Sequence, residues 1–374
     1  MSWSRFLAIL LKEFRQIRRD RLTFAMMVGV PILQLILFGF AINTDPKHLP
    51  LALVCADEST FSRSFIAALE NSAYFRITQR PSSEAQANQL LAEGRVQFVL
   101  VIPANFSRRL IRGEKPAVLL AADATDPAAS GNALAAVNAI SRQALQRDLT
   151  GPLASLQPTD APFEVRVQRR YNPEGLSRYN IVPGLIGVIL TMTMVMMTAL
   201  AMTRERERGT MENLLATPVR PFEVMAGKIV PYILIGYVQV TVILVAAHLL
   251  FDVPMVGSLG LLLFALVLFM AANLAVGFTF STIAKNQLQA MQLTFFFFLP
   301  SILLSGFMFP FRGMPIWAQW IGQVLPLTHF LRIVRGILLK GNTLAEITPS
   351  LWPIAAFMLV AGAIALQRYQ KTLD

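Results

Sequence analysis

The sequence predicts a polytopic α-helical membrane protein with six transmembrane helices and an extracytoplasmic α/β domain inserted between helices 1 and 2. Hydrophobic residues make up 55% of its 374 residues and charged residues only 15%, against about 25% charged residues in an ordinary soluble protein. The apolar residues gather in six runs, and five of these runs lie after residue 180. Between the first run and the others, residues 43–180 have the mixed pattern of a water-soluble domain.

The six runs approach the length of about 20 residues that a helix needs to cross a hydrocarbon layer. They comprise 24–42, 181–203, 229–250, 259–280, 291–309 and the shorter 351–366. Residues 310–350 are broken by prolines and charges, so we expect re-entrant or surface helices there. A cleaved signal peptide is disfavoured for the first run, because that run exceeds the usual apolar core of about 7 to 15 residues.

The Lys and Arg residues predict the orientation of these spans. Fourteen lie in 1–23, 204–228, 281–290 and the C-terminal tail, whereas the short segments of the opposite side carry four. By the positive-inside rule both termini are cytoplasmic and residues 43–180 are extracytoplasmic. Most of the net charge of +11 therefore lies beside the inner leaflet. Membrane lipid is its expected partner, and no nucleic acid is expected.

Within 43–180 the alternation of apolar strands and helices indicates a small sheet covered by helices. We expect strands at 51–56, 74–78, 96–102, 117–122 and 163–170, and helices at 62–71, 83–93, 107–112 and 132–149. Asp123 and Asp126 could be offered as a metal pair, but two acids around a proline are more typical of a turn. The domain lacks a phosphate-binding loop and other catalytic motifs. It is predicted to serve in docking or gating.

The predicted spans lack the groups that an ion-coupled carrier uses. No Asp, Glu, Lys or Arg falls inside the first five, although such carriers bind their ion with a buried ionisable group. The chain also lacks the GxxxxGK[ST] loop that binds the phosphates of ATP. Energy for transport is therefore expected to come from another chain.

The cytoplasmic segment 204–228 combines charge with apolar residues. Alternating Arg and Glu extend the second span, Gly209 and Thr210 interrupt them, and Pro221 suits the first turn of a short helix that ends at Lys228. The apolar residues among the charges are Leu214, Leu215, Phe222, Val224 and Met225. A merely solvated loop would not need these apolar side chains, so we expect this segment to contact a cytoplasmic partner.

The same segment carries a family resemblance. Residues 207–218, Glu-Arg-Gly-Thr-Met-Glu-Asn-Leu-Leu-Ala-Thr-Pro, resemble the characteristic stretch of the ABC-2 family of ABC transporter permeases. Residues 325–330, Leu-Pro-Leu-Thr-His-Phe, continuing to Gly341, are similar to the family's segment before the last helix. Residues 103–107 and the turn at 57–60 resemble the variety with a large extracytoplasmic domain.

The resemblance implies the transmembrane subunit of an exporter in the bacterial inner membrane, for a drug, lipid or other amphipathic compound. Such a subunit is no enzyme and binds no cofactor, since ATP and Mg²⁺ belong to separate ATP-binding subunits. It works with a second permease copy, either an identical chain or a sister chain. Whether a periplasmic adaptor binds to the outer domain is left open. The amphipathic segment 1–23 would be an interfacial helix that also touches the ATPase. Implied ATPase-coupling residues are Glu205, Arg208, Gly209, Thr210, Glu212, Pro218, Pro221, Phe222, Glu223 and Lys228.

The expected substrate path lies between two permease copies, along the second and fifth spans. Methionine provides an adaptable surface there, and phenylalanine provides aromatic contacts. The path residues are Thr191, Met194, Met196, Met197, Phe295, Phe297, Ser301 and Ser305. Two other functions stay open at this point. One is a membrane-anchored sensor or mechanical transducer with a partner-binding outer domain, and the other is an ion-coupled carrier.

Overall fold

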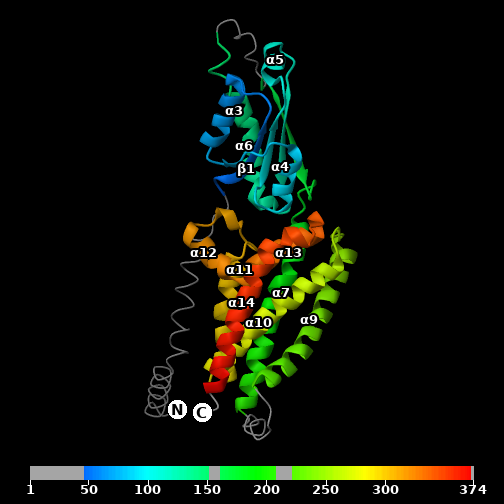
Figure 1. Cartoon of the computed structure of the whole chain (residues 1–374), viewed down its shortest axis with the longest axis vertical. Helices are drawn as coiled ribbons and strands as arrows, with labels where there is room; N and C mark the ends of the chain where they lie inside the picture. The colour runs from blue at the N-terminus through cyan, green and yellow to red at the C-terminus, as the bar shows by residue number, and fades with distance from the viewer. Residues whose placement is uncertain (1–45, 151–160, 208–220, 372–374) are drawn as a thin grey trace, which may run out of the picture.

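The computed structural model describes residues 46–150, 161–207 and 221–371. An α/β unit stands on one end of a bundle of long helices (Figure 1). The expected interfacial helix at 1–23 and the expected first span at 24–42 lie outside the described residues. Residues 208–220 of the expected coupling segment also lie outside them.

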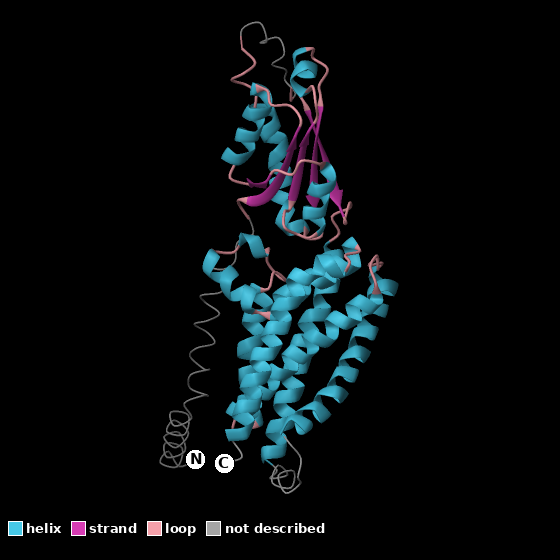
Figure 2. Cartoon of the chain, in the orientation of Figure 1, coloured by secondary structure: helices cyan, strands magenta, loops and turns pink. Residues whose placement is uncertain are grey.

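The α/β unit contains a five-stranded sheet in the order β2-β1-β3-β4-β5 (Figure 2). Its elements are β1 Leu49–Cys55, α3 Thr60–Asn71, β2 Phe75–Gln79, α4 Glu84–Ala92, β3 Phe98–Ile102, α5 Phe106–Ile111, β4 Ala117–Asp123, α6 Pro127–Gln143 and β5 Glu164–Arg170. Strands β3 and β4 pair antiparallel, and the other neighbours pair parallel. Each expected strand lies within two residues of an observed strand.

Alternate side chains of the central strands pack on opposite faces of the sheet. On β1, Leu51 and Leu53 belong to the core that includes residues of α3, α5 and α6. Ala52 points to the other face and packs with Ala87 and Leu91 of α4. The sheet is therefore buried on both sides, which explains the continuous apolar runs of its inner strands.

Helix α6 differs from the expected helix at 132–149. It begins at Pro127 because the Asp126 carboxylate accepts a hydrogen bond from the N–H of Ala129, and because proline is favoured in the first turn of a helix. It ends at Gln143, and turns follow it. Asp126, one of the two acids that were expected to form a turn, therefore also begins a helix.

Five helices of the described chain are long and apolar enough to cross a membrane. They are α7 Ser177–Glu207, α9 Pro221–Phe251, α10 Leu259–Ile283, α11 Gln287–Leu304 and α14 Leu344–Lys371. They coincide with five of the six expected spans, and the total of six remains a prediction. Short elements lie between their ends and the α/β unit (Figure 1). These are η3 Phe311–Gly313, α12 Ile316–Val324, α13 Pro326–Arg335 and one π-helical turn, η4 Gly336–Lys340.

Helix α10 packs against both α7 and α14. A glycine lets α10 and α7 approach closely, because a Cβ atom added to Gly277 would lie 2.7 Å from the carbonyl oxygen of Val195. Small residues serve this purpose between membrane helices in general. At the end near the α/β unit, Phe269 stacks on Phe330 of α13 with ring centroids 4.1 Å apart. Helix α13 is thus part of the bundle core.

Candidate functional site

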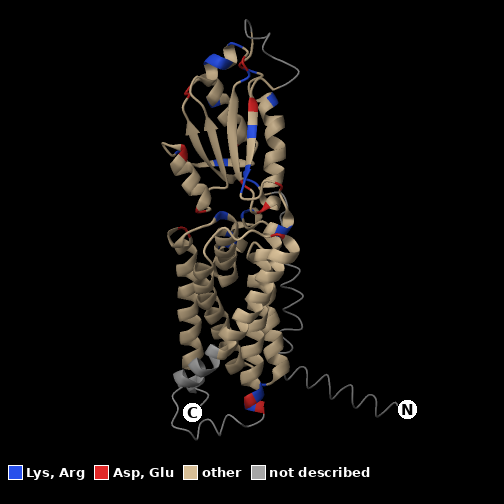
Figure 3. Ribbon diagram, turned by 90° about the vertical axis from the view of Figure 1, so that its right-hand side faces the viewer, with Lys and Arg blue, Asp and Glu red and all other residues tan. Residues whose placement is uncertain are grey.

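The expected coupling residues that the structure describes lie at the end of the bundle that is remote from the α/β unit. Figure 3 shows charged residues gathered at that end of α7, whose last residues include Glu205. The residues Arg208, Gly209, Thr210, Glu212 and Pro218 lie outside the described chain. Pro221, Phe222, Glu223 and Lys228 fall in the first turns of α9, so the short helix expected from Pro221 to Lys228 is continuous with the next span.

Glu207, which the sequence analysis did not single out, connects two helices at this end. Its carboxylate accepts hydrogen bonds from the backbone N–H of Gln287, at 2.8 Å, and from the amide of the same residue. Gln287 is the first residue of α11, where a carboxylate also interacts favourably with the helix dipole. Glu207 therefore fixes the end of α7 against the beginning of α11.

The expected path residues lie on α7 and at α11, two helices that pack against each other, and they differ in burial. On α7, Thr191 and Met194 are buried in the bundle, whereas Met196 and Met197 are half-buried. On α11, Ser301 is also buried, Phe297 is half-buried and Phe295 is 45% exposed, and the C-cap residue Ser305 after this helix is buried. The hydroxyls of Thr191 and Ser301 donate to carbonyl oxygens of their own helices. A path formed by these residues stays a prediction that depends on a second copy.

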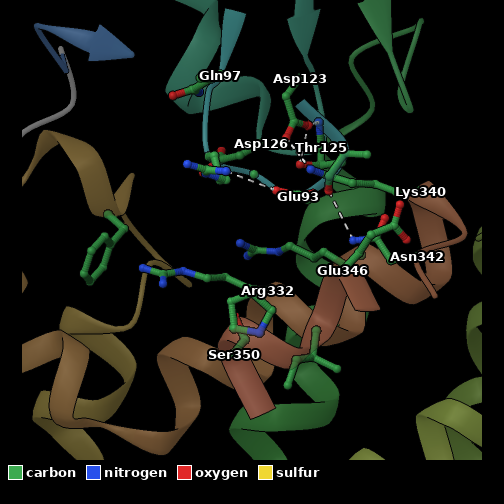
Figure 4. Close-up of a pocket in the computed structure, with 18 of the residues that line it drawn as sticks. Glu93, Gln97, Asp123, Thr125, Asp126, Arg332, Lys340, Asn342, Glu346 and Ser350 are labelled. Atoms are coloured by element: carbon green, nitrogen blue, oxygen red, sulfur yellow. Dashed lines mark hydrogen bonds and ion pairs between the residues drawn. The ribbon is translucent and has the colours of Figure 1, made fainter. Parts of the chain in front are cut away.

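A polar cavity of about 470 Å³ lies between the α/β unit and the helices. Figure 4 shows Gln97, Asp123 and Asp126 on the side of the α/β unit, and Arg332 and Asn342 on the side of the helices. Arg95, Arg312, Arg335 and Lys340 supply further positive charge, and Glu93 and Glu346 further negative charge. Five basic and four acidic side chains thus line one cavity.

The two sides of this junction cavity are joined by direct contacts. Lys340 Nζ lies 2.5 Å from Asp123 Oδ2. From the helix side, the Asn342 amide donates to the carbonyl of Ala92, and the Arg312 guanidinium donates to the carbonyl of Gly94 at 2.7 Å. These bonds satisfy backbone groups at the end of α4 and fix the cavity walls.

Each acidic side chain of the cavity already has a partner of its own. Asp123 pairs with Lys340, and Glu93 lies 3.8 Å from Arg95. Asp126 caps α6, and Glu346 accepts hydrogen bonds from the N–H and hydroxyl of Thr343. No carboxylate of the described residues lies within ion-pair distance of the three remaining arginines, Arg312, Arg332 and Arg335.

Burial shifts the ionisation of these groups in opposite directions. Burial raises the pKa of Asp126, although the charge of Arg335 opposes the shift. Burial also lowers the pKa of Arg335. The pKa of Arg332 falls to about 10, first because of burial and then because of the charge of Arg312. Asp126 and Asp123 therefore act on Arg335 through their charges, although neither carboxylate lies within ion-pair distance of it.

Helix α12 forms a wall of the cavity and also carries exposed apolar side chains. Gln319 and Gln323, four residues apart, line the cavity. The exposed apolar residues of the same helix include Ile316, Trp320 and Val324, with exposed fractions of 69%, 73% and 65%. Tryptophan is enriched where a membrane meets water. The exposed Trp320 of this helix is therefore of the kind that is typical of a membrane–water interface.

This cavity was not predicted from the sequence, although one signal for it was present. Residues 310–350 carry four basic residues on the side of the membrane where few were expected, namely Arg312, Arg332, Arg335 and Lys340. All four line the cavity. Their convergence with the end of β4 depends on contacts between distant parts of the chain, which no local pattern shows.

Comparisons with known proteins agree along nearly the whole chain. The family model described as "ABC-2 family transporter protein" matches residues 21–366. The chain is 29% identical over 368 residues to the Escherichia coli "probable multidrug ABC transporter permease YbhS", covering 97% of this chain and 95% of YbhS. It is 27% identical over 367 residues to the E. coli "probable multidrug ABC transporter permease YbhR", covering 98% of this chain and 98% of YbhR. It is 29% identical over 390 residues to the E. coli "inner membrane transport permease YhhJ", covering 97% and 96%.

Proposed function

On the premise that the chain belongs to the ABC-2 family of transporter proteins, we propose that it is the permease subunit of an ATP-driven exporter. It moves a drug, lipid or other amphipathic compound across the inner membrane by alternating access. Separate ATP-binding subunits bind and hydrolyse ATP, and two permease chains form the path. The family membership agrees with the resemblance carried by residues 207–218.

The similarity to named permeases over nearly the full length of both partners carries this proposal. Such similarity includes the α/β unit as well as the helices, so the whole architecture is that of a transport subunit. The word "multidrug" belongs to the names of YbhS and YbhR. It supports an amphipathic cargo here and does not identify one compound.

The chemistry of the bundle supports an external energy source. Thr191, Thr198 and Thr203 are buried on α7, and each hydroxyl donates to a carbonyl four residues earlier at 2.8 Å. On α10, the buried Asn273 amide donates to the carbonyl of Phe269. The Asn273 oxygen is buried without a hydrogen-bond partner but carries no charge, and 259–280 contains no Asp, Glu, Lys or Arg. An ion-coupled carrier is therefore disfavoured.

The placement of the charges supports the orientation of the proposed subunit. Residues 204–207 alternate Arg and Glu at the end of α7 that points away from the α/β unit (Figure 3). We assign this end to the cytoplasm, where the ATP-binding subunits lie, and the α/β unit to the outer side. The coupling residues from Glu205 to Lys228 would then contact the ATPase.

The test is a pull-down of the tagged full-length chain from its native membrane in a mild detergent. Mass spectrometry identifies the co-purifying chains, and an ATPase assay is run on the eluate. We expect an ATP-binding subunit with a P-loop, whose activity rises when an amphipathic drug or lipid is added. Absence of any ATPase, even after cross-linking, would contradict the proposal and favour the transducer function.

A further inference from the structure

The five basic and four acidic side chains of the junction cavity leave it with one excess positive charge. Arg312, Arg332 and Arg335 line it together, and no carboxylate of the described residues lies within ion-pair distance of these three arginines, although the charges of Asp123 and Asp126 act on Arg335. We propose that this cavity binds a phosphate-type oxyanion through these three guanidinium groups. An amphipathic molecule whose headgroup carries the anion is the source that the surroundings favour.

The three arginines keep most of their donors available. A guanidinium has five N–H donors. Arg312 uses one on the Gly94 carbonyl, and Arg332 contacts the Gln323 amide oxygen at a distance of 3.5 Å. Arg335 reaches the carbonyl of Gly306 at 3.3 and 3.4 Å, and its Nε atom is buried without a hydrogen-bond partner. A buried donor of a charged group is costly to leave unpaired, and an oxyanion would satisfy it.

The arginines are also held in place before a ligand arrives. The guanidinium carbon of Arg332 lies 5.0 Å from the centre of the Phe311 ring, and Arg312 is anchored to the backbone of the α/β unit. Planar guanidinium groups match the oxygens of phosphate in pairs, which a lysine cannot do. Preorganised donors reduce the entropy lost on binding.

Size and position favour a headgroup over a bare ion. The volume of about 470 Å³ lies within the range of about 300 to 1,000 Å³ that is typical of ligand pockets. The cavity adjoins α12, whose Trp320 and Val324 are exposed on the face that we assign to the membrane interface. An anion seated among the arginines could therefore keep its apolar tail in the lipid.

This inference deepens the proposed function, and it rests on that function for the meaning of the bound molecule. A compound leaving the bundle on the outer side would meet the cavity between the helices and the α/β unit. Binding itself is a property of this chain alone. It can be measured without an ATPase partner and without transport, so failure of binding leaves the pull-down result untouched.

The experiment is isothermal titration calorimetry on the purified full-length chain in a non-ionic detergent. The probes are inorganic phosphate, dihexanoyl phosphatidic acid below its micelle concentration, and uncharged dihexanoylglycerol. We expect saturable binding of phosphatidic acid, weaker binding of inorganic phosphate and none of dihexanoylglycerol. Equally tight binding of inorganic phosphate would support the oxyanion site and assign it to free phosphate compounds.

The variant Arg332→Gln should weaken phosphatidic acid binding by about 10- to about 100-fold, since a hydrogen bond to a charged group contributes about 1.5 to 3 kcal/mol. The matched control Arg109→Gln removes the same charge from exposed α5 and should leave binding unchanged. If Arg332→Gln does not fold, Arg332→Lys keeps the charge, loses the planar fork and should still bind several-fold less tightly. No saturable binding of either anion, or an equal loss in Arg109→Gln, would overturn the proposal.

Discussion

Lys340 Nζ lies 2.5 Å from Asp123 Oδ2 across the junction, although 217 positions separate the two residues in the chain. The two side chains are only 8% and 12% exposed. Lys340 also donates to the carbonyl of Leu91 and lies 5.2 Å from the centre of the Tyr171 ring. One lysine thus connects the turn η4 with the end of β4, with α4 and with the segment that leads from β5 into α7.

Removing this lysine should destabilise the junction. Lys340→Met leaves the Asp123 carboxylate buried without its counter-ion, which typically costs about 3 to 5 kcal/mol. We expect faster hydrogen–deuterium exchange of the backbone around Ala92 and Asn342, measured by mass spectrometry on the full chain in detergent.

A double variant distinguishes the loss of the ion pair from the loss of packing contacts made by Lys340. Lys340→Met combined with Asp123→Leu should restore much of the protection, because two apolar residues tolerate burial better than one unpaired charge. The exposed pair Arg109 and Glu114 provides the control, since such pairs contribute at most about 1 kcal/mol. Equal effects of Lys340→Met and Arg109→Met would show that the junction pair has no special role.

The long helices and most of the α/β unit could be predicted because their signals are local. Hydropathy over about 20 residues marks a span, and an apolar run between turns marks an inner strand. The boundary of α6 was missed because Asp126 and Pro127 give a turn signal and a helix-start signal together. Local patterns of this kind are ambiguous until the tertiary contacts of the segment are known.

The junction could not be predicted because its contacts join distant parts of the chain. Asp123 does form the expected turn, since its Oδ1 accepts hydrogen bonds from the N–H and hydroxyl of Thr125. Its second oxygen meets Lys340, which the sequence analysis noted only as part of a resemblance. The coupling and path residues depend on partner chains, so they remain predictions.

A methyl group at the crossing of α10 and α7 should destabilise the bundle. In Gly277→Ala the new Cβ would lie 2.7 Å from the Val195 carbonyl oxygen and 2.8 Å from Thr198 Cβ, so the two helices must separate. Overpacking of this kind costs about 1 to 3 kcal/mol. We expect a lower melting temperature in detergent, measured by intrinsic fluorescence.

Gly362→Ala on α14 is the matched control for this prediction. A Cβ added there meets nothing within 4 Å in the described structure. Alanine also favours a helix over glycine by about 1 kcal/mol. The control should melt at an unchanged or higher temperature, and a similar loss in both variants would refute the packing argument.

The Asp57 carboxylate should make the α/β unit more stable near neutral pH than in acid. Burial alone would raise the pKa of Asp57, but hydrogen bonds from Ser59 and Ser107 outweigh this effect and the pKa is lowered. The N–H and hydroxyl of Ser107 both donate to Asp57 Oδ2 at 2.9 Å. These bonds join the turn after β1 to α5, and thereby bring together two of the motifs that carried the family resemblance.

A lowered pKa in the folded state means that the stabilisation is fully present above the ordinary pKa of aspartate, about 4. It is lost as the pH falls through the folded-state value. Asp57→Asn should therefore increase hydrogen–deuterium exchange of residues 57–62 and 106–111 at pH 7. The free energy of the opening that exposes these amides should fall by about 1 to 3 kcal/mol. The difference from the wild type should shrink at pH 3. A difference that is independent of pH would contradict the charge-based explanation.

Reversing a charge in the proposed ATPase contact should separate the permease from its partner without preventing membrane insertion. Glu223 lies in the first turns of α9, in the segment that we assign to the cytoplasm. A partner surface that is complementary to the negative charge of Glu223 is positive, so a lysine at this position would create a like-charge contact, which costs several kcal/mol. Glu223→Lys should therefore reduce the amount of co-purified ATPase by about tenfold or more.

The control Glu70→Lys makes the same change at the exposed end of α3 in the α/β unit, and should retain the ATPase in full. Normal ATPase recovery and transport with Glu223→Lys would exclude this residue from the coupling contact, whereas equal loss in both variants would indicate a general effect of charge on assembly.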